Sequence, residues 1–235
     1  MSDKHYRVAV FVETSRAYGR ALCEGIADFA QANGHWVFEG GGESWEQGVA
    51  EIAGKADGVI ARIPNAEMAD ALSRLGIPVV DLYRWGEYPL IATADADHAA
   101  IGRLAAEWFV ERRFRHFAFC GYRSAPFSKL RGAAFKESVE RAGFSCSVYE
   151  ETRFDPDFLG KLILQAEAYG DPPDRKRLAA WLKALPRPAA VLCCHDIRAY
   201  QVITLCKELG LDVPRDVAVM RSEEHTSELQ SHHDL

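Results

Sequence analysis

The 235-residue sequence lacks several features that would place it in a common functional class. No apolar run is long enough to span a bilayer, so a membrane-spanning helix is not predicted. Neither nucleotide-binding fingerprint, GxGxxG or GxxxxGK(S/T), occurs, and the run at 40–42 is only three consecutive glycines. Basic residues are not in excess either, since 28 Lys and Arg face 34 Asp and Glu, a net charge of −6. The chain as a whole therefore offers no electrostatic attraction for a nucleic acid backbone.

The cysteines also lack the spacing of a metal or redox motif. No CxxC pair occurs among Cys23, Cys120, Cys146, Cys193, Cys194 and Cys206. We therefore expect reduced, buried thiols in a cytoplasmic protein, with no metal and no cofactor. The first residues, MSDKHYRVAVFVE, pass directly from polar residues into a strand pattern, so a secretory signal is not predicted.

What the sequence does contain is a regular alternation of strands and helices. Short apolar runs predict buried strands at 7–12, 35–39, 58–61, 77–82, 116–120, 145–149, 189–193 and 217–220. Helical periodicity predicts helices at 18–33, 44–53, 66–75, 98–112, 129–142, 175–184 and 198–209. The helix at 98–112 is expected to have one apolar side, formed by Ile101, Leu104, Ala105, Trp108 and Phe109. This alternation indicates an α/β fold of parallel sheets flanked by helices.

Two segments resemble a known family. DHAAIGRLAAEWFVERRFRHFAFCG and AAVLCCHDIRAYQVITLCKELGLDVPRDVAVM are similar to the sugar-sensing domains of LacI-type regulators, and the resemblance covers about residues 6–220. It implies a two-lobed, periplasmic-binding-protein-like α/β fold, with an N-terminal lobe at 6–122 and a partial C-terminal lobe at 123–220. The stretch VETSRAYGRALCEGI further resembles the first loop and helix of xylose-responsive regulators of the AraC family, in which the DNA-binding domain follows the sensor.

Residues 221–235 break the pattern. They have no apolar period, and RSEEHTSELQSH resembles the conceptual translation of a sequencing-library adapter. We expect a non-native or disordered tail there, and a second lobe that is incomplete after Met220. A natural acidic tail is the alternative.

Candidate ligand-binding residues follow the ends of the predicted strands, because ligands bind outside the carboxyl ends of parallel strands. The candidates are Ser15, Arg16, Tyr18, Arg62, Arg84, Asp97, Arg131, His195 and Asp196. Asp and Arg side chains can bind sugar hydroxyls through several hydrogen bonds, and aromatic rings can cover the C–H faces of a sugar. The resemblance favours Arg131 and Asp196, for which a surface salt bridge is the alternative. Asp97 is equally well explained as the N-cap of the following helix.

A catalytic role is not expected for the run 193–196, Cys-Cys-His-Asp. Consecutive strand residues face opposite sides of a sheet, so these side chains cannot converge as a triad. A flavodoxin-like or nucleotide-binding enzyme would need a phosphate-cradling loop or a convergent acid–base pair, and the sequence has neither. We therefore expect no enzymatic activity.

The resemblance implies the sugar-sensing domain of a DNA-binding transcriptional regulator, responsive to xylose or another small neutral pentose. Its implied partners are a second copy in a homodimer and operator DNA, contacted through a C-terminal domain outside this chain, with no membrane partner. The alternative is a transport-type periplasmic sugar-binding protein, which the absence of a signal segment disfavours. We expect this chain alone to bind sugar weakly and not to bind DNA specifically.

Overall fold

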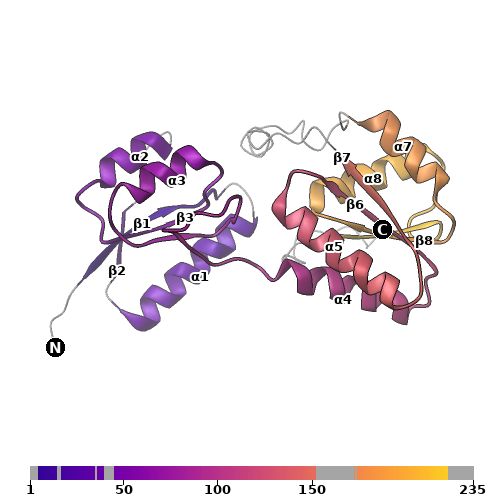
Figure 1. The fold of residues 1–235 in the computed structure, drawn as a ribbon, viewed down its shortest axis with the longest axis horizontal. Helices are drawn as coiled ribbons and strands as arrows, with labels where there is room; N and C mark the ends of the chain where they lie inside the picture. The colour runs from indigo at the N-terminus through magenta and orange to yellow at the C-terminus, as the bar shows by residue number, and fades with distance from the viewer. Residues whose placement is uncertain are drawn as a thin grey trace, which may run out of the picture. The chain divides into compact units, whose positions relative to one another are not determined.

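The computed structural model describes residues 5–14, 17–34, 36–39, 45–151, 172 and 174–221. They form two compact units that divide between Ala96 and Asp97 (Figure 1). The sequence predicts this boundary at 122 instead. The difference arises because helix α4 (His98–Glu111) and strand β6 (His116–Tyr122) pack with the second sheet rather than the first.

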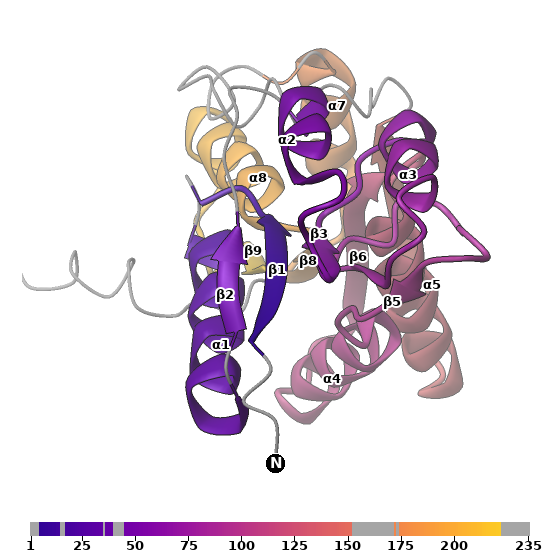
Figure 2. The same cartoon turned by 90° about the vertical axis from the view of Figure 1, so that its left-hand side faces the viewer.

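The first unit contains a parallel sheet with the strand order β2-β1-β3-β4-β5. Its strands are β1 (Tyr6–Phe11), β2 (Trp36–Glu39), β3 (Gly58–Ala61), β4 (Val79–Asp81) and β5 (Ala92–Thr93). Helices α2 (Trp45–Ile52) and α3 (Ala66–Ser73) cover one face, and α1 (Ala17–Asn33) lies on the other (Figures 1 and 2). The core forms under α2 and α3, where Ile52, Met68 and Leu72 pack on β1, β3 and β4.

The second unit is built on a parallel sheet with the order β7-β6-β8-β9. Beside β6, its strands are β7 (Cys146–Glu151), β8 (Ala189–Cys193) and β9 (Val217–Arg221). Helices α4 and α5 (Pro126–Arg141) cover one face, and α7 (Arg175–Ala184) and α8 (Asp196–Glu208) the other (Figure 1). Every residue of β8 is fully buried, as its uninterrupted apolar sequence AAVLC predicts.

Helices α4 and α5 approach each other closely at Gly102. A Cβ atom at this position would lie 2.4 Å from the carbonyl oxygen of Arg131 and 2.8 Å from the backbone nitrogen of Phe135. The absence of a side chain therefore sets the position of α5, and with it the position of Arg131.

The predicted fold class, parallel sheets flanked by helices, is confirmed. The apolar side predicted for α4 is wrong in part, because Leu104 is 64% and Trp108 41% exposed. The buried stripe of α4 instead includes Gly102, Ala105 and Phe109, since small residues allow the close contact with α5. The short strand β5 is absent from the prediction, and α5 begins at Pro126 rather than at Lys129.

The last described residue, Arg221, belongs to β9, where it pairs with Cys193 of β8. The prediction that the irregular tail begins at Arg221 is therefore wrong by one residue. The rest of the predicted tail, 222–235, lies outside the described residues.

Candidate functional site

In the second unit, Arg131 on α5 reaches the carboxyl end of β8. Its Nη1 donates to the carbonyl oxygen of Cys194 at 2.6 Å, and its Nε donates to Nδ1 of His98 at 3.3 Å. The guanidinium group also lies 5.3 Å from the ring centre of Phe127. Because Nδ1 of His98 accepts a hydrogen bond, the neutral ring carries its proton on Nε2. The contacts with His98, Phe127 and Cys194 thus fix the orientation of the Arg131 guanidinium group.

His195 lies beside this cluster and caps helix α8. Its Nδ1 accepts a hydrogen bond from the backbone N–H of Arg198 at 3.2 Å. Its ring lies 5.2 Å from that of Tyr122, at the end of β6, and 6.0 Å from that of Phe127. The cap makes Nδ1 an acceptor, so the neutral His195 ring also carries its proton on Nε2.

Asp196, the first residue of α8, forms an ion pair with Arg221 at the end of β9. Both side chains are about one quarter exposed, at 22% and 28%. The second carboxylate oxygen, Oδ1, is buried and accepts no hydrogen bond from the described residues. A buried oxygen without a donor is costly, so this atom is suited to accept a hydrogen bond from a ligand hydroxyl.

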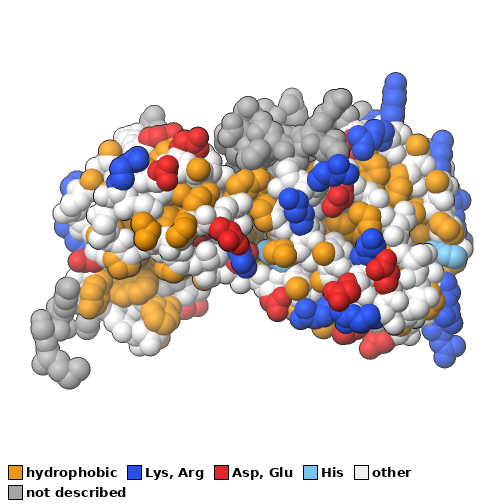
Figure 3. Space-filling model, in the orientation of Figure 1, with side chains coloured by type: hydrophobic (Ala, Val, Ile, Leu, Met, Phe, Trp, Pro, Cys, Tyr) orange, Lys and Arg blue, Asp and Glu red, His pale blue; other side chains and the backbone are white. Residues whose placement is uncertain are grey.

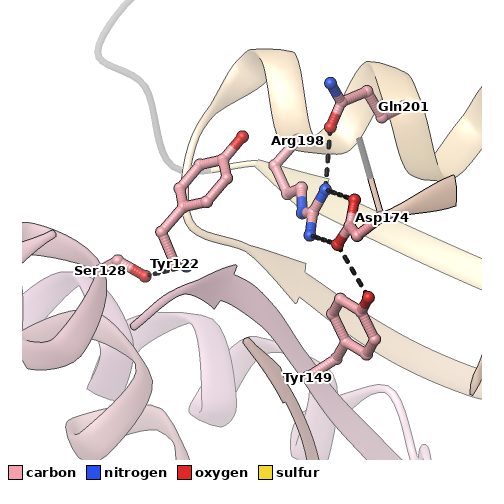
Figure 4. Close-up of polar contacts among 6 residues, drawn as sticks. All are labelled: Tyr122, Ser128, Tyr149, Asp174, Arg198 and Gln201. Carbon is pink, nitrogen blue, oxygen red and sulfur yellow. Dashed lines mark hydrogen bonds and ion pairs between the residues drawn. The ribbon is translucent and has the colours of Figure 1, made fainter. Parts of the chain in front are cut away.

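Beneath these residues lies a buried polar network (Figure 4). Arg198, which is 1% exposed, binds Asp174 through two hydrogen bonds of 3.2 and 2.6 Å. Arg198 also donates to Oε1 of Gln201 at 3.0 Å, and the hydroxyl of Tyr149 donates to Asp174 at 2.8 Å. Sequence reasoning missed this network, because Arg198 has the spacing of an ordinary helix residue and Asp174 lies between the strand predicted at 145–149 and the helix predicted at 175–184, where no element is predicted.

We expect acid to destabilise the chain through Asp174. Burial opposes ionisation of this carboxyl, but the hydrogen bonds and charge of Arg198, with further hydrogen bonds from Glu151 and Tyr149, outweigh it and lower its pKa from 3.8 to about 2. Because the folded pKa lies below the unfolded one, the ionised carboxylate stabilises the fold above about pH 4, and this stabilisation is lost as the pH falls through about 2. The loss amounts to ~2 kcal/mol. Urea unfolding at a series of pH values measures it, and the Asp174→Asn variant should lack this component. Equal acid sensitivity of both proteins would contradict the assignment.

In the first unit, Arg62 and Tyr18 lie together at the carboxyl ends of β1 and β3. The Arg62 guanidinium is 5.2 Å from the ring centre of Tyr18 and 4.5 Å from that of Tyr83. Tyr83 stacks on Trp85, with ring centres 5.4 Å apart. Nε of Arg62 is buried and has no hydrogen-bond partner among the described residues. This series of planar groups presents one cation and several aromatic faces, which suits the mixed polar and C–H surface of a sugar.

Asp81 connects the loop that carries Arg62 with the loop that carries Tyr83 and Trp85. Its buried carboxylate accepts hydrogen bonds from the backbone N–H groups of Ile63, Tyr83 and Arg84, at 2.9–3.1 Å. Arg84 is thereby held at a φ of 48°, a conformation that favours glycine. Its side chain is about half exposed and lies 3.9 Å from Glu87.

The remaining candidates are not brought into these clusters. Asp97 caps helix α4, since its side chain accepts from the N–H of Ala100 at 2.8 Å and is 67% exposed. The structure thus gives Asp97 the alternative role of an N-cap. Ser15 and Arg16 lie outside the described residues. His98, which contacts Arg131, was not among the candidates, and its place one residue after the Asp97 cap was the only available signal.

Among the described residues, no group of three or more His, Cys, Asp and Glu side chains is placed to hold a metal ion. Over the same residues, no helix has both the length and the apolarity needed to cross a membrane. All six cysteines are free thiols. The expectation that all are buried is wrong for Cys23 and Cys146, which are only partly covered.

Comparisons with known proteins agree with this architecture. The xylose operon regulatory protein of Escherichia coli K12 is 25% identical over 230 residues, which cover 94% of this chain and 55% of that protein. The chain thus spans about half the length of the curated relatives it matches.

Solved structures with the same fold include two proteins of different biological roles. A periplasmic ribose ABC transporter protein from Conexibacter woesei superimposes with a TM-score of 0.71 at 17% identity, covering 94% of this chain and 74% of that one. A periplasmic binding protein/LacI transcriptional regulator from Alkaliphilus metalliredigens, complexed with D-xylulofuranose, gives a TM-score of 0.65 at 15% identity, covering 93% and 78%. At these identities the likeness shows the fold alone.

The family model for the periplasmic binding protein-like domain matches residues 106–231, more than half of the chain. This match covers most of the second unit, including α5, β8 and α8, which carry Arg131, His195 and Asp196. The family resemblance predicted from the sequence is confirmed by these findings. The chain belongs to the periplasmic binding protein-like domain family.

Proposed function

We propose that this chain is the sugar-sensing part of a transcription regulator, and that its ligand is a pentose such as D-xylose. The match of 94% of the chain to the xylose operon regulatory protein of E. coli supports a regulator over other members of the fold. The D-xylulofuranose bound to the A. metalliredigens protein supports a pentose-sized ligand. The whole regulator's activity and partners are part of the same proposal, because the chain spans 55% of the E. coli protein.

The observation that carries this proposal is the arrangement of Arg131, His195 and Asp196 at the carboxyl ends of β8 and β9. Arg131 is a preoriented fork of donors, and Asp196 has a buried oxygen that accepts nothing from the described residues. A neutral polyol needs such donors and acceptors at fixed positions, together with an apolar ring surface like that of Phe127. The proposed sugar contacts of this unit are therefore Arg131, His195 and Asp196. Tyr18 and Arg62 are proposed separately, as sugar-binding residues of the first unit.

Replacing Arg131 by alanine is expected to weaken D-xylose binding by more than tenfold, because a hydrogen bond to a charged group contributes roughly 1.5–3 kcal/mol. The sequence predicts weak binding by this chain, so the measurement is an NMR titration of the ¹⁵N-labelled protein with D-xylose, D-ribose and D-glucose. On addition of sugar, the backbone amide resonances around Arg131 and His195 should shift in the wild type and stay unchanged in the variant.

The matched control is Arg123→Ala, which removes an arginine of the same unit whose exposed side chain pairs only loosely with Glu150, at 3.6 Å. It should bind D-xylose as the wild type does. A wild-type chain that responds to no sugar, or an Arg131→Ala variant with unchanged affinity, would count against the proposal.

We further propose that the complete regulator is a cytoplasmic homodimer without catalytic activity, which binds operator DNA through a domain outside this chain. Exposed apolar side chains on the first unit support a second copy as partner (Figure 3). They include Phe29 of α1 and Val37 and Phe38 of β2, an edge strand of the sheet.

A second candidate function is a sugar-binding protein of a transport system. A periplasmic ribose ABC transporter protein has the same fold, so the fold is common to both functions. A reporter gene joined to the regulator's operator separates the two, because only a regulator changes its expression when sugar is added.

A further inference from the structure

We propose that the buried Arg198–Asp174 pair is a positioning element for the sugar-binding residues of the second unit, acting through Tyr122 and His195. The inference rests on the proposed function. It concerns residues that do not themselves face the ligand, because Arg198 and Asp174 are almost completely buried. Figure 4 shows the pair between Tyr122 and Tyr149, which come from neighbouring strands β6 and β7.

The pair has the geometry of an anchor. Both ends of the Arg198 fork bind the two oxygens of Asp174, and Nη1 also binds Gln201 one turn further along α8. The same guanidinium lies 5.1 Å from the ring centre of Tyr122 and 5.5 Å from that of Tyr149. A planar guanidinium bound in this way has one orientation, so the two rings that pack on it are oriented as well.

Tyr122 is held at two points. Its backbone N–H donates to Oγ of Ser128, a fully buried side chain on α5, at 2.9 Å. Its ring lies over Arg198 and, 5.2 Å away, contacts the ring of His195. Tyr122 therefore transmits the position of the buried guanidinium to a residue of the candidate sugar site.

His195 depends on Arg198 in a second way. The backbone N–H of Arg198 is the donor to Nδ1 of His195, and the side chain of the same residue is tied to Asp174. Anchoring the Arg198 side chain thus fixes the first turn of α8, which holds the cap and the adjacent Asp196. From His195 the ring contacts continue to Phe127, at 6.0 Å, and from Phe127 to Arg131, at 5.3 Å.

A purely structural role would make the pair important for stability alone. The two roles differ in what happens when both charges are removed together. In the double variant Arg198→Met/Asp174→Asn neither member of the pair is left as a buried charge without its partner, so most of the folding stability should be retained, and the asparagine oxygen can still accept from Tyr149. A positioning role predicts that the Tyr122 and His195 rings nevertheless lose their fixed orientation.

The test compares the full chain with this double variant by NMR, without sugar. Because the ring of Tyr122 lies 5.2 Å from that of His195, we expect it to displace the His195 ring resonances from random-coil values. Removing the pair should move them back toward those values, and Arg198→Lys, which keeps the charge but not the fork, should give an intermediate shift. The control is Leu182→Ala, which deletes a fully buried side chain of α7 and lowers stability while leaving the Arg198–Asp174 pair, Tyr122 and His195 in the sequence. Unchanged His195 resonances in the double variant would overturn the inference.

A D-xylose titration of the same proteins gives the second readout. We expect the double variant to lose affinity about tenfold, and Leu182→Ala to keep the wild-type affinity at temperatures where it is folded. Equal affinity of the double variant and the wild type would overturn the positioning role for the sugar site. A wild-type protein that binds no sugar would contradict the proposed function instead, and the ring resonances would then decide whether the pair positions His195.

Discussion

Replacing Arg198 alone by methionine is expected to lower the free energy of unfolding by about 3–5 kcal/mol, because it leaves the carboxylate of Asp174 buried without its cation. The side chains of Arg198 and Asp174 are 1% and 2% exposed, so water cannot compensate for the lost partner. Urea-induced unfolding, followed by tryptophan fluorescence, measures the change, and Trp181 is a reporter close to the site. Trp181 packs on Tyr149, which itself binds Asp174.

The matched comparison is the double variant Arg198→Met/Asp174→Asn. It should recover most of the loss, since removing both charges leaves neither member of the pair buried without its partner. If the two single variants and the double variant are equally destabilised, the pair contributes packing and not electrostatic compensation.

The second large effect is expected at Gly102, where alanine should cost about 3 kcal/mol. The new Cβ would lie 2.4 Å from the carbonyl oxygen of Arg131 and 2.8 Å from the nitrogen of Phe135. Backbone atoms of a packed helix cannot yield as a flexible side chain does, so α5 has to move away from α4. This movement would also stretch the 2.6 Å bond between Arg131 and Cys194, so the variant should lose sugar affinity as well as stability.

Gly25→Ala on α1 is the control for this substitution. No atom lies within 4 Å of a Cβ built at Gly25, so alanine should be neutral or should stabilise the helix by about 0.5–1 kcal/mol through its higher helix propensity. Thermal denaturation of both variants separates steric conflict from propensity. A Gly102→Ala variant that melts with the wild type would show that the α4–α5 contact is more adaptable than its geometry indicates.

The strands and helices could be predicted from the sequence because their hydrophobic periods are undisturbed. The run AAVLC indicates a buried strand whatever its neighbours, and β8 is indeed fully buried. The orientation of α4 could not be predicted in the same way. Its apolar period predicts one buried side that contains Leu104 and Trp108 together with Ala105, but Leu104 and Trp108 are exposed in the structure. Only the approach of α5 determines that the stripe of small residues is buried.

The candidate site, too, could be predicted from the sequence only in part. The position of Arg131 and His195 near one strand end follows from the rule that ligands bind at the carboxyl ends of parallel strands, and the structure brings these two residues together around Phe127. The Arg198–Asp174 pair joins residues 24 positions apart. A buried residue that only positions the site residues leaves no local sequence pattern. The pairing of Arg198 with Asp174 is therefore visible only in the folded structure.

The carboxylate of Asp81 has a practical consequence for protein engineering. It binds backbone N–H groups of the loop after β3 and of the loop after β4, so these two loops are attached to a single oxygen pair. A graft that exchanged one loop for that of a related sensor, in order to alter ligand preference, would leave Asp81 with mismatched donors in a dry environment. The two loops and Asp81 should therefore be transplanted together. Within these loops, glycine in place of Arg84 would relieve its left-handed backbone conformation.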